Sequence, residues 1–292
     1  MKSIKRIPGP FLIFLGAFCL SFGGLIVKSF DQANLWQILF WRQFFFAIIV
    51  SLYLLVVYKK KIFKSFYVSG VPGFLAGFIL SLGFASYVFS MYKTTVANTN
   101  FIIATETIFL ALFGYFFLKE KIKLVTYISI FLGMLGVLLI IGNSLSFQTS
   151  DELLGNIVAF IMPISFAVLV IIIRKYPNVD MVPAQFTAGI FAAIIGFIIA
   201  GNLTISLHDL FLALIAGFFQ VGLGFILITI GSRTTPSAMV GILMLSESVF
   251  GPLWAWLFIS ELMPISVLIG GCIIIFSILL QTFFSENRNN IN

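Results

Sequence analysis

Three ionisable residues, Arg42, Glu106 and Glu247, lie deep inside long apolar stretches of the sequence. A helix rises about 1.5 Å per residue, so about ten residues place each glutamate near the middle of a hydrocarbon core roughly 30 Å thick. A charge at that depth costs roughly 2.5–3.5 kcal/mol. Such a residue therefore faces a cavity, meets a partner of opposite charge or is neutral.

Arg42 and Glu106 are expected at similar depths, which leaves two interpretations open. They form a structural ion pair between two helices, or they line a cavity and bind the charged ends of a solute. Both can hold, because a pair exposed to a water-filled cavity can open for a ligand. The planar guanidinium of Arg42 also matches the geometry of a carboxylate.

Glu247 has no basic residue at its own depth. Desolvation favours the protonated form of a buried, unpaired carboxylate, which makes Glu247 the better candidate for binding and releasing a coupling proton. Pro252 leaves the carbonyl of Ser248 without its helical donor. This proline indicates either a ligand-binding carbonyl or a simple kink.

Trp41 precedes Arg42 and is interpreted either as part of an interfacial aromatic belt or as lining an outer gate. The predicted substrate-binding residues are therefore Arg42, Glu106, Glu247, Ser248 and Trp41. No catalytic residue, bound cofactor or metal site is predicted. Cys19 and Cys272 lie in apolar runs and are expected to be small buried residues.

The composition predicts that these residues are positioned by membrane-spanning helices. Of the 292 residues 61% are hydrophobic and 9% are charged, whereas soluble domains carry about 25% charged residues. The apolar runs are continuous, which favours helices over barrel strands. The predicted fold is all-α and integral to the membrane, with ten transmembrane helices at approximately 10–29, 34–57, 70–91, 96–118, 124–142, 153–173, 182–200, 210–231, 236–259 and 264–284.

The basic residues predict the orientation of these helices. With the N-terminus in the cytoplasm, fourteen of the seventeen Lys and Arg residues fall on the inner side, and Lys28 and Lys93 on the outer side. The positive-inside rule then places both termini in the cytoplasm of a multi-pass protein of the cell (inner) membrane. Because the charges lie at the ends of apolar runs, the net charge of +7 does not indicate nucleic-acid binding.

Two related halves are visible in the sequence. Thr94-Thr95 and the segment beginning at Glu106 match Thr234-Thr235 and the segment beginning at Glu247, with a constant offset from each glutamate onward. The halves are predicted as residues 1–147 and 148–292, each a repeat of five helices. Five is odd, so the second repeat is inverted relative to the first. Secondary transporters use this plan, with a site near the midplane where the repeats meet.

The layout of the chain resembles the EamA-type ten-helix members of the drug/metabolite transporter superfamily. The segment Ser246–Glu261 is similar to the family's Glu-x-x-Phe pattern followed by an apolar run and a closing Glu. In the second predicted helix, at 34–57, Phe40-Trp41-Arg42 is similar to a family segment that carries an arginine near the start of the same helix. Glu106 stands where many relatives have proline. The resemblance implies transport of a small organic solute, such as an amino acid or another metabolite, across the lipid bilayer.

Three other functions were weighed against a secondary transporter with alternating access. No Walker-type phosphate loop is present, so ATP is not the direct driver. An intramembrane enzyme would need a nucleophile and base or a metal cluster, and the sequence has no such motif. Whether the secondary transporter uses a proton gradient stays open, and a facilitator or exchanger without proton coupling is the alternative. Two fused halves suggest that a monomer suffices.

Overall fold

A computed structural model describes residues 7–94, 96–141, 150–259 and 265–286. All elements in these ranges are helical. The first part of the chain forms α1 (Gly9–Leu20), α2 (Gly23–Lys28), α3 (Leu35–Tyr58), the 3-10 turn η1 (Lys59–Lys61), α4 (Ile62–Lys93), α5 (Val96–Ala104), α6 (Glu106–Leu118) and α7 (Leu124–Ile141).

The second part forms α8 (Ser150–Ala159), α9 (Ile161–Lys175), α10 (Val182–Ala200), α11 (Leu207–Ile215), the π-helical η3 (Ala216–Leu223), α12 (Gly224–Ser232), α13 (Ser237–Met244), α14 (Ser246–Ile259) and α15 (Ile265–Glu286). Several predicted spans are therefore interrupted. The ranges 10–29, 96–118, 153–173 and 236–259 each correspond to two consecutive helices.

Eight helical runs in the described residues are long and apolar enough to cross a membrane. One of them, Leu35–Lys93, is 59 residues long and contains both α3 and α4, which lie on either side of the turn at Lys59–Lys61. A shorter apolar helix covers Leu124–Ile140. The all-helical membrane class is thus confirmed, while the count of ten crossings stays a prediction.

The predicted span at 70–91 begins at a break inside α4, which as a whole starts at Ile62. Gly70 has a positive φ of 53° and interrupts the helical backbone, so residues 62–69 form a separate short turn of helix. The exposed surface along the bundle is rich in large apolar side chains, including Phe63, Phe131 and Phe197. A surface of exposed apolar side chains is stable in contact with lipid rather than with water.

Helices from the two parts of the chain pack against each other in pairs. The closest neighbours are α3 with α10, α7 with α15, α4 with α10, α4 with α9 and α1 with α12, and α6 packs against α13. At the contact of α7 with α15, a Cβ on Gly136 would lie 2.7 Å from the carbonyl oxygen of Gly270, and a Cβ on Gly270 would lie 2.5 Å from that of Gly136. The missing side chains let the two backbones touch, as is common between membrane helices.

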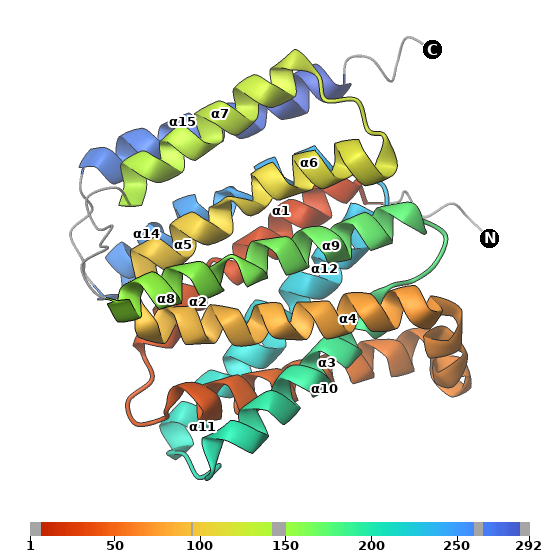
Figure 1. The fold of residues 1–292 in the computed structure, drawn as a ribbon, viewed down its shortest axis with the longest axis vertical. Helices are drawn as coiled ribbons and strands as arrows, with labels where there is room; N and C mark the ends of the chain where they lie inside the picture. Colours follow the sequence, from red (N-terminus) through yellow and green to blue (C-terminus); the bar gives the residue numbers. More distant parts are fainter. Residues whose placement is uncertain (1–6, 95, 142–149, 260–264, 287–292) are drawn as a thin grey trace.

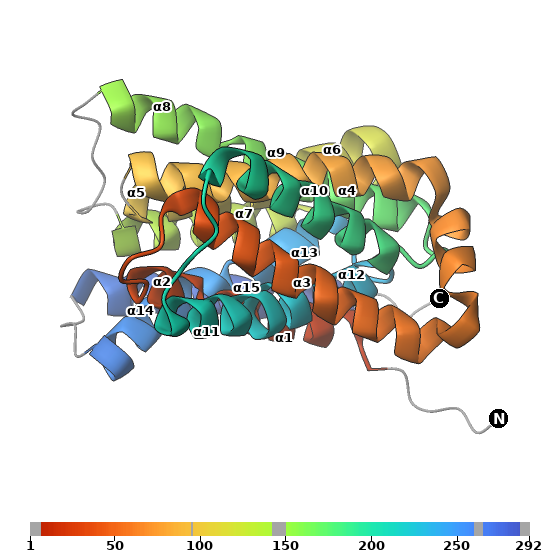
Figure 2. The ribbon, with the colours of Figure 1, turned by 90° about the horizontal axis from the view of Figure 1, so that it is seen from below.

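The bundle has two distinct ends (Figures 1 and 2). The turn between α3 and α4, the start of α1 and the C-terminal ends of α6 and α9 lie at one end. We call this the basic end, because Lys59, Lys60, Lys61, Arg174 and Lys175 lie there. The starts of α5 and α8 and the end of α14 lie at the opposite end.

Candidate functional site

Both predicted glutamates lie where a long helix is interrupted. Glu106 is the first residue of α6, directly after the break at Thr105, and Glu247 is the second residue of α14, after the break at Leu245. The hydroxyl of Thr105 donates to the carbonyl of Ile102, and that of Ser246 donates to Leu243 at 2.7 Å. Such bonds to the preceding turn bend helices.

The hydroxyls of Thr105 and Ser246 therefore turn back to their own helices. Thr107 also turns away, because its hydroxyl donates to the carbonyl of Gly241 on α13 at 3.0 Å. This contact joins α6 to α13, one helix from each predicted half. Ser248 is half-buried and stays a predicted ligand.

Glu106 and Glu247 form an acidic pair. Glu106 is 4% exposed, and Glu247 is half-buried. The two carboxylates interact electrostatically, so α6 and α14 direct them toward a common region. Within the described residues, neither glutamate has a basic side chain in ion-pair distance. Two acidic groups without a basic partner suit a site that takes up a cation or a proton.

The hypothesis of an Arg42–Glu106 ion pair is wrong in this structure. Helix α3 packs against α10 and η3, whereas α6 packs against α13 and α9, so equal depth does not bring the two side chains together. Arg42 instead lies over the ring of Tyr87, with its guanidinium carbon 5.2 Å from the ring centre. Such cation–π contact is worth roughly 0.5–2 kcal/mol.

Arg42 is 3% exposed, and its Nε has no hydrogen-bond partner among the described residues. Gln43, which follows it, is fully buried with both amide atoms unpaired in the described structure. Buried polar groups normally have partners. The unpaired groups of these two residues on α3 are therefore available to a solute.

Tyr87, which lies under Arg42, also lies near Gln220. A side chain on Gly23 would lie 2.7 Å from the Nε2 of Gln220 and 3.3 Å from the hydroxyl of Tyr87, so all three residues meet. Tyr87 also interacts electrostatically with Glu247. Gln220 belongs to the π-helical η3, and such segments are frequent at functional sites. We call Arg42, Tyr87, Gln220, Glu106 and Glu247 the central polar group.

A cluster of aromatic rings lies beside the central polar group. Trp254 stacks on Phe22 with ring centres 4.4 Å apart, and its indole N–H donates to the hydroxyl of Ser21 at 2.8 Å. Phe18 and Phe219 pack edge-on against the same rings. Trp254 is seven residues beyond Glu247, roughly 10 Å along α14 toward the end opposite the basic end. The aromatic cluster therefore lies on that side of Glu247.

Trp41 lies apart from this cluster. Its indole N–H donates to the carbonyl of Leu203 at 2.8 Å, and its ring packs against Phe40, Phe44 and Phe45. These contacts anchor α3 to the loop before α11. A role for Trp41 in substrate binding stays a prediction. The side chain of Pro252 lies outside the described residues.

At the basic end, Glu120 joins three helices. Its Oε1 accepts from Nε and Nη2 of Arg174 at 3.0 and 2.7 Å, and its Oε2 accepts from the backbone N–H of Ser237 at 2.9 Å. Ser237 is the first residue of α13, so the carboxylate also meets the positive end of a helix dipole. We call Glu120, Arg174 and Ser237 the Glu120 latch. It holds the ends of α6 and α9 to the start of α13.

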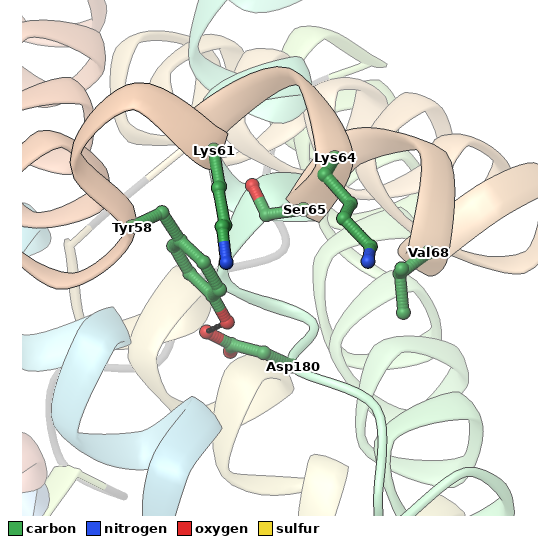
Figure 3. A pocket seen from close by; sticks show the side chains of 6 residues that line it. All are labelled: Tyr58, Lys61, Lys64, Ser65, Val68 and Asp180. Atoms are coloured by element: carbon green, nitrogen blue, oxygen red, sulfur yellow. Dashed lines mark hydrogen bonds between the residues drawn. The ribbon is translucent and has the colours of Figure 1, made fainter.

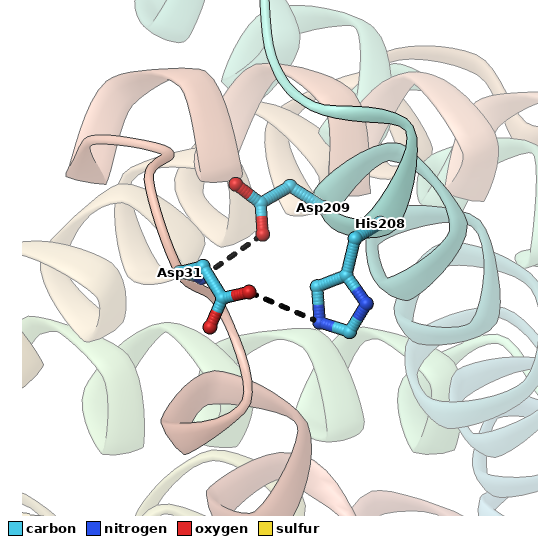
Figure 4. A group of neighbouring side chains, drawn as sticks. All are labelled: Asp31, His208 and Asp209. Atoms are coloured by element: carbon cyan, nitrogen blue, oxygen red, sulfur yellow. Dashed lines mark hydrogen bonds and ion pairs between the residues drawn. The ribbon is translucent and has the colours of Figure 1, made fainter.

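Asp31, His208 and Asp209 form the one group with metal-ligand potential among the described residues (Figure 4). Asp209 is fully buried, and its carboxylate accepts from the backbone N–H groups of Asp31, Gln32 and Ala33 at 2.9 to 3.1 Å. His208 and Asp31 form an exposed contact of 3.7 Å. Because backbone donors occupy the buried carboxylate, the group clamps the loop before α3 to α11.

Tyr87, Gln220 and Gln43 were missed by the sequence analysis. Each is a polar side chain inside an apolar run, the same signal that identified Arg42, but without a formal charge. The sequence did not indicate which of several such residues share one site. Their helices, α4, η3 and α3, come together only through packing.

The comparisons with known proteins identify the family. A family model described as the EamA-like transporter family matches residues 7–142 and 152–283. The chain belongs to this family. It is 28% identical over 184 residues to an uncharacterized transporter of Methanothermobacter thermautotrophicus, covering 61% of this chain and 53% of that protein.

Two further similarities agree with this assignment. A second uncharacterized transporter, from Clostridium kluyveri, is 22% identical over 222 residues, covering 73% of this chain and 71% of that protein. A protein of known crystal structure superposes with a TM-score of 0.80 at 14% identity, covering 96% of this chain and 98% of the other. The latter similarity concerns the fold.

Proposed function

We propose that the protein is a secondary transporter that moves a small organic solute, such as an amino acid or another metabolite, by alternating access. Membership of the EamA-like transporter family supports the class. The observation that carries the proposal is the central polar group, which holds an arginine of α3 with an unpaired Nε, stacked on Tyr87, and two glutamates at the starts of α6 and α14. A solute with a carboxylate and an amine would meet complementary charges there.

The proposal includes ten membrane crossings arranged as two inverted repeats, residues 1–147 and 148–292. Counting α3 and α4 separately and adding α7 to the other runs gives ten. If helices of the two repeats are exchanged, the pairs α3–α10 and α7–α15 map onto themselves, and α1–α12 maps onto α4–α9. This pattern of contacts supports a two-fold relation between the repeats.

Alternating access requires a barrier on each side of the site that can open in turn. The aromatic cluster around Trp254 and the Glu120 latch are suited to these two roles, since they close opposite ends of the bundle. The cluster consists mainly of aromatic rings, and the latch is polar. Each consists of contacts between helices that can separate without breaking a helix.

Coupling to protons is proposed to run through Glu247, the half-buried member of the acidic pair. The competing function is a facilitator or exchanger, in which the acidic pair binds only the solute. A thermal-shift screen of amino acids, carboxylates and amines on the purified protein identifies a ligand. Uptake of that ligand into proteoliposomes then separates the two functions: accumulation against its gradient under an imposed pH gradient supports coupling, and equilibration alone supports facilitation.

Failure of every small solute to bind or to cross the membrane would contradict the transporter proposal itself. The screen should include both zwitterions and analogues that lack either charge. Binding that requires both charged ends is the expected result, because Arg42 and the acidic pair offer opposite charges. Equal binding of an uncharged analogue would mean that the central polar group is not the solute site.

A further inference from the structure

A pocket of about 220 Å³ lies at the basic end, away from the central polar group (Figure 3). It forms between the turn that joins α3 to α4 and the loop before α10. Its lining residues are Tyr58, Lys61, Lys64, Ser65, Val68 and Asp180. A water molecule takes about 30 Å³ in the liquid, so the pocket has room for roughly seven waters or a small polar group.

The pocket carries a net positive charge. Lys61 and Lys64 extend their ammonium groups into it, and neither has a carboxylate within 4.0 Å among the described residues. Asp180 is the acid in the lining. Its Oδ2 accepts from the hydroxyl of Tyr58 at 2.7 Å, and its Oδ1 accepts from the backbone N–H of Val182 at 3.0 Å. Asp180 therefore holds the pocket wall together.

The surface beside the pocket has the character of a membrane interface. The short turn of helix before Gly70 exposes Phe63 and Tyr67, which are 84% and 87% exposed, next to Lys64. Aromatic rings and lysines together favour the boundary between headgroups and acyl chains. Val68 forms the apolar side of the pocket, and Val71, just beyond the break at Gly70, is also exposed.

We propose that this pocket binds the phosphate of an anionic phospholipid headgroup, with Lys61 and Lys64 on the phosphate oxygens and an acyl chain along Val68 and Val71. Basic pockets between membrane helices bind anionic headgroups in this way. The adjoining exposed apolar surface favours a lipid over a free anion, which would make no use of it. The proposal does not depend on which solute the protein transports.

Native mass spectrometry of the full chain, purified in mixed micelles of phosphatidylglycerol and phosphatidylcholine, tests the site. The wild type should retain phosphatidylglycerol selectively. Lys61→Gln with Lys64→Gln should weaken this retention roughly 20- to 30-fold, because each lysine near an anionic surface contributes about a fivefold factor. The matched control is Lys59→Gln with Lys60→Gln, which removes the same charge from adjacent positions that do not line the pocket.

Melting temperatures of both double variants establish that the fold is kept, and Lys61→Arg with Lys64→Arg should restore the retention. If both double glutamine variants lose phosphatidylglycerol equally, the proposal is contradicted. The lysines would then act only through a diffuse electrostatic field at the basic end. Retention unchanged in the Lys61/Lys64 pair would also overturn the proposal. Displacement of the lipid by inorganic phosphate at low millimolar concentration would assign the pocket to a free anion instead.

Discussion

At the scale of single residues, Glu247 is the group whose role is most directly testable. It is half-buried beside Glu106 and has no basic partner in the described structure. In Glu247→Gln, the side chain keeps its size and hydrogen bonds but cannot titrate. Accumulation driven by a pH gradient should be abolished, while exchange of solute across the membrane survives because it needs no net proton movement. Paired uptake and exchange assays in proteoliposomes measure both.

Glu106→Gln provides the contrast at the equivalent position of the other half. It removes a charge from the same acidic pair but leaves the more exposed carboxylate. Weaker binding of an amine-bearing solute is expected, with the response to the pH gradient retained. If Glu247→Gln accumulates solute normally, Glu247 is a solute ligand and the protein is a facilitator or exchanger.

Arg42 is expected to bind the carboxylate of the solute through its planar fork. Arg42→Lys keeps the charge but loses the fork and much of the stacking on Tyr87. Loss of a charge-assisted hydrogen bond costs about 1.5–3 kcal/mol, so affinity should fall roughly 10- to 100-fold. Titration calorimetry with the solute and with its uncharged amide analogue isolates the effect. An equal loss for both compounds, or no loss, would leave Arg42 with a structural role.

At the scale of helices, Asp209 fixes the loop before α3 to α11. Its carboxylate accepts three backbone N–H groups, whereas an asparagine would turn an amide donor toward one of them. Asp209→Asn should therefore destabilise the protein by about 2 kcal/mol. His208→Gln removes an exposed neighbour and should change stability by less than about 0.5 kcal/mol. Melting curves of both variants in the same detergent test this, and equal effects would contradict the clamp.

The Glu120 latch connects the ends of three helices and should control opening at the basic end. Glu120→Gln removes the charge that Arg174 and the start of α13 share. Spin labels at Lys119→Cys and Lys175→Cys, both exposed, report the separation of α6 and α9 by double electron–electron resonance after Cys19 and Cys272 are replaced. In Glu120→Gln, the distribution of distances between the two spin labels should shift to longer values.

Asp151→Asn is the matched control for the latch. Asp151 forms an exposed ion pair with Lys93 at 3.0 Å on α8, at the opposite end of the bundle. This substitution should leave the distance between Lys119→Cys and Lys175→Cys unchanged. A Glu120→Gln distribution identical to that of the wild type would show that the latch does not hold this end closed.

At the scale of the whole molecule, the gathering of lysines and arginines at one end predicts that this end is cytoplasmic. A reporter fused after Asn292 should be active only in the cytoplasm, and one inserted in the loop at Asn202 should be active only outside. Activity of the C-terminal fusion outside the cell would reverse the topology and remove the basis for ten crossings.

The sequence alone determined the membrane class and the gathering of basic residues, and it predicted the depth of the charged residues. These properties depend on composition and on counting residues along a helix axis, where each residue adds a constant rise. The same counting located Glu106 and Glu247 in equivalent segments of the two halves. It also placed Arg42 and Glu106 at one depth, which led to the ion pair that the structure does not contain.

Only the tertiary structure decided which residues meet at that depth. Depth is one coordinate, and the position of a helix across the bundle depends on packing between helices far apart in sequence. That packing directs Arg42 to Tyr87 rather than to Glu106, and brings Gln220 to the same place. It also brings Trp254 of α14 onto Phe22 and Ser21, which lie between α1 and α2 more than 200 residues earlier in the sequence.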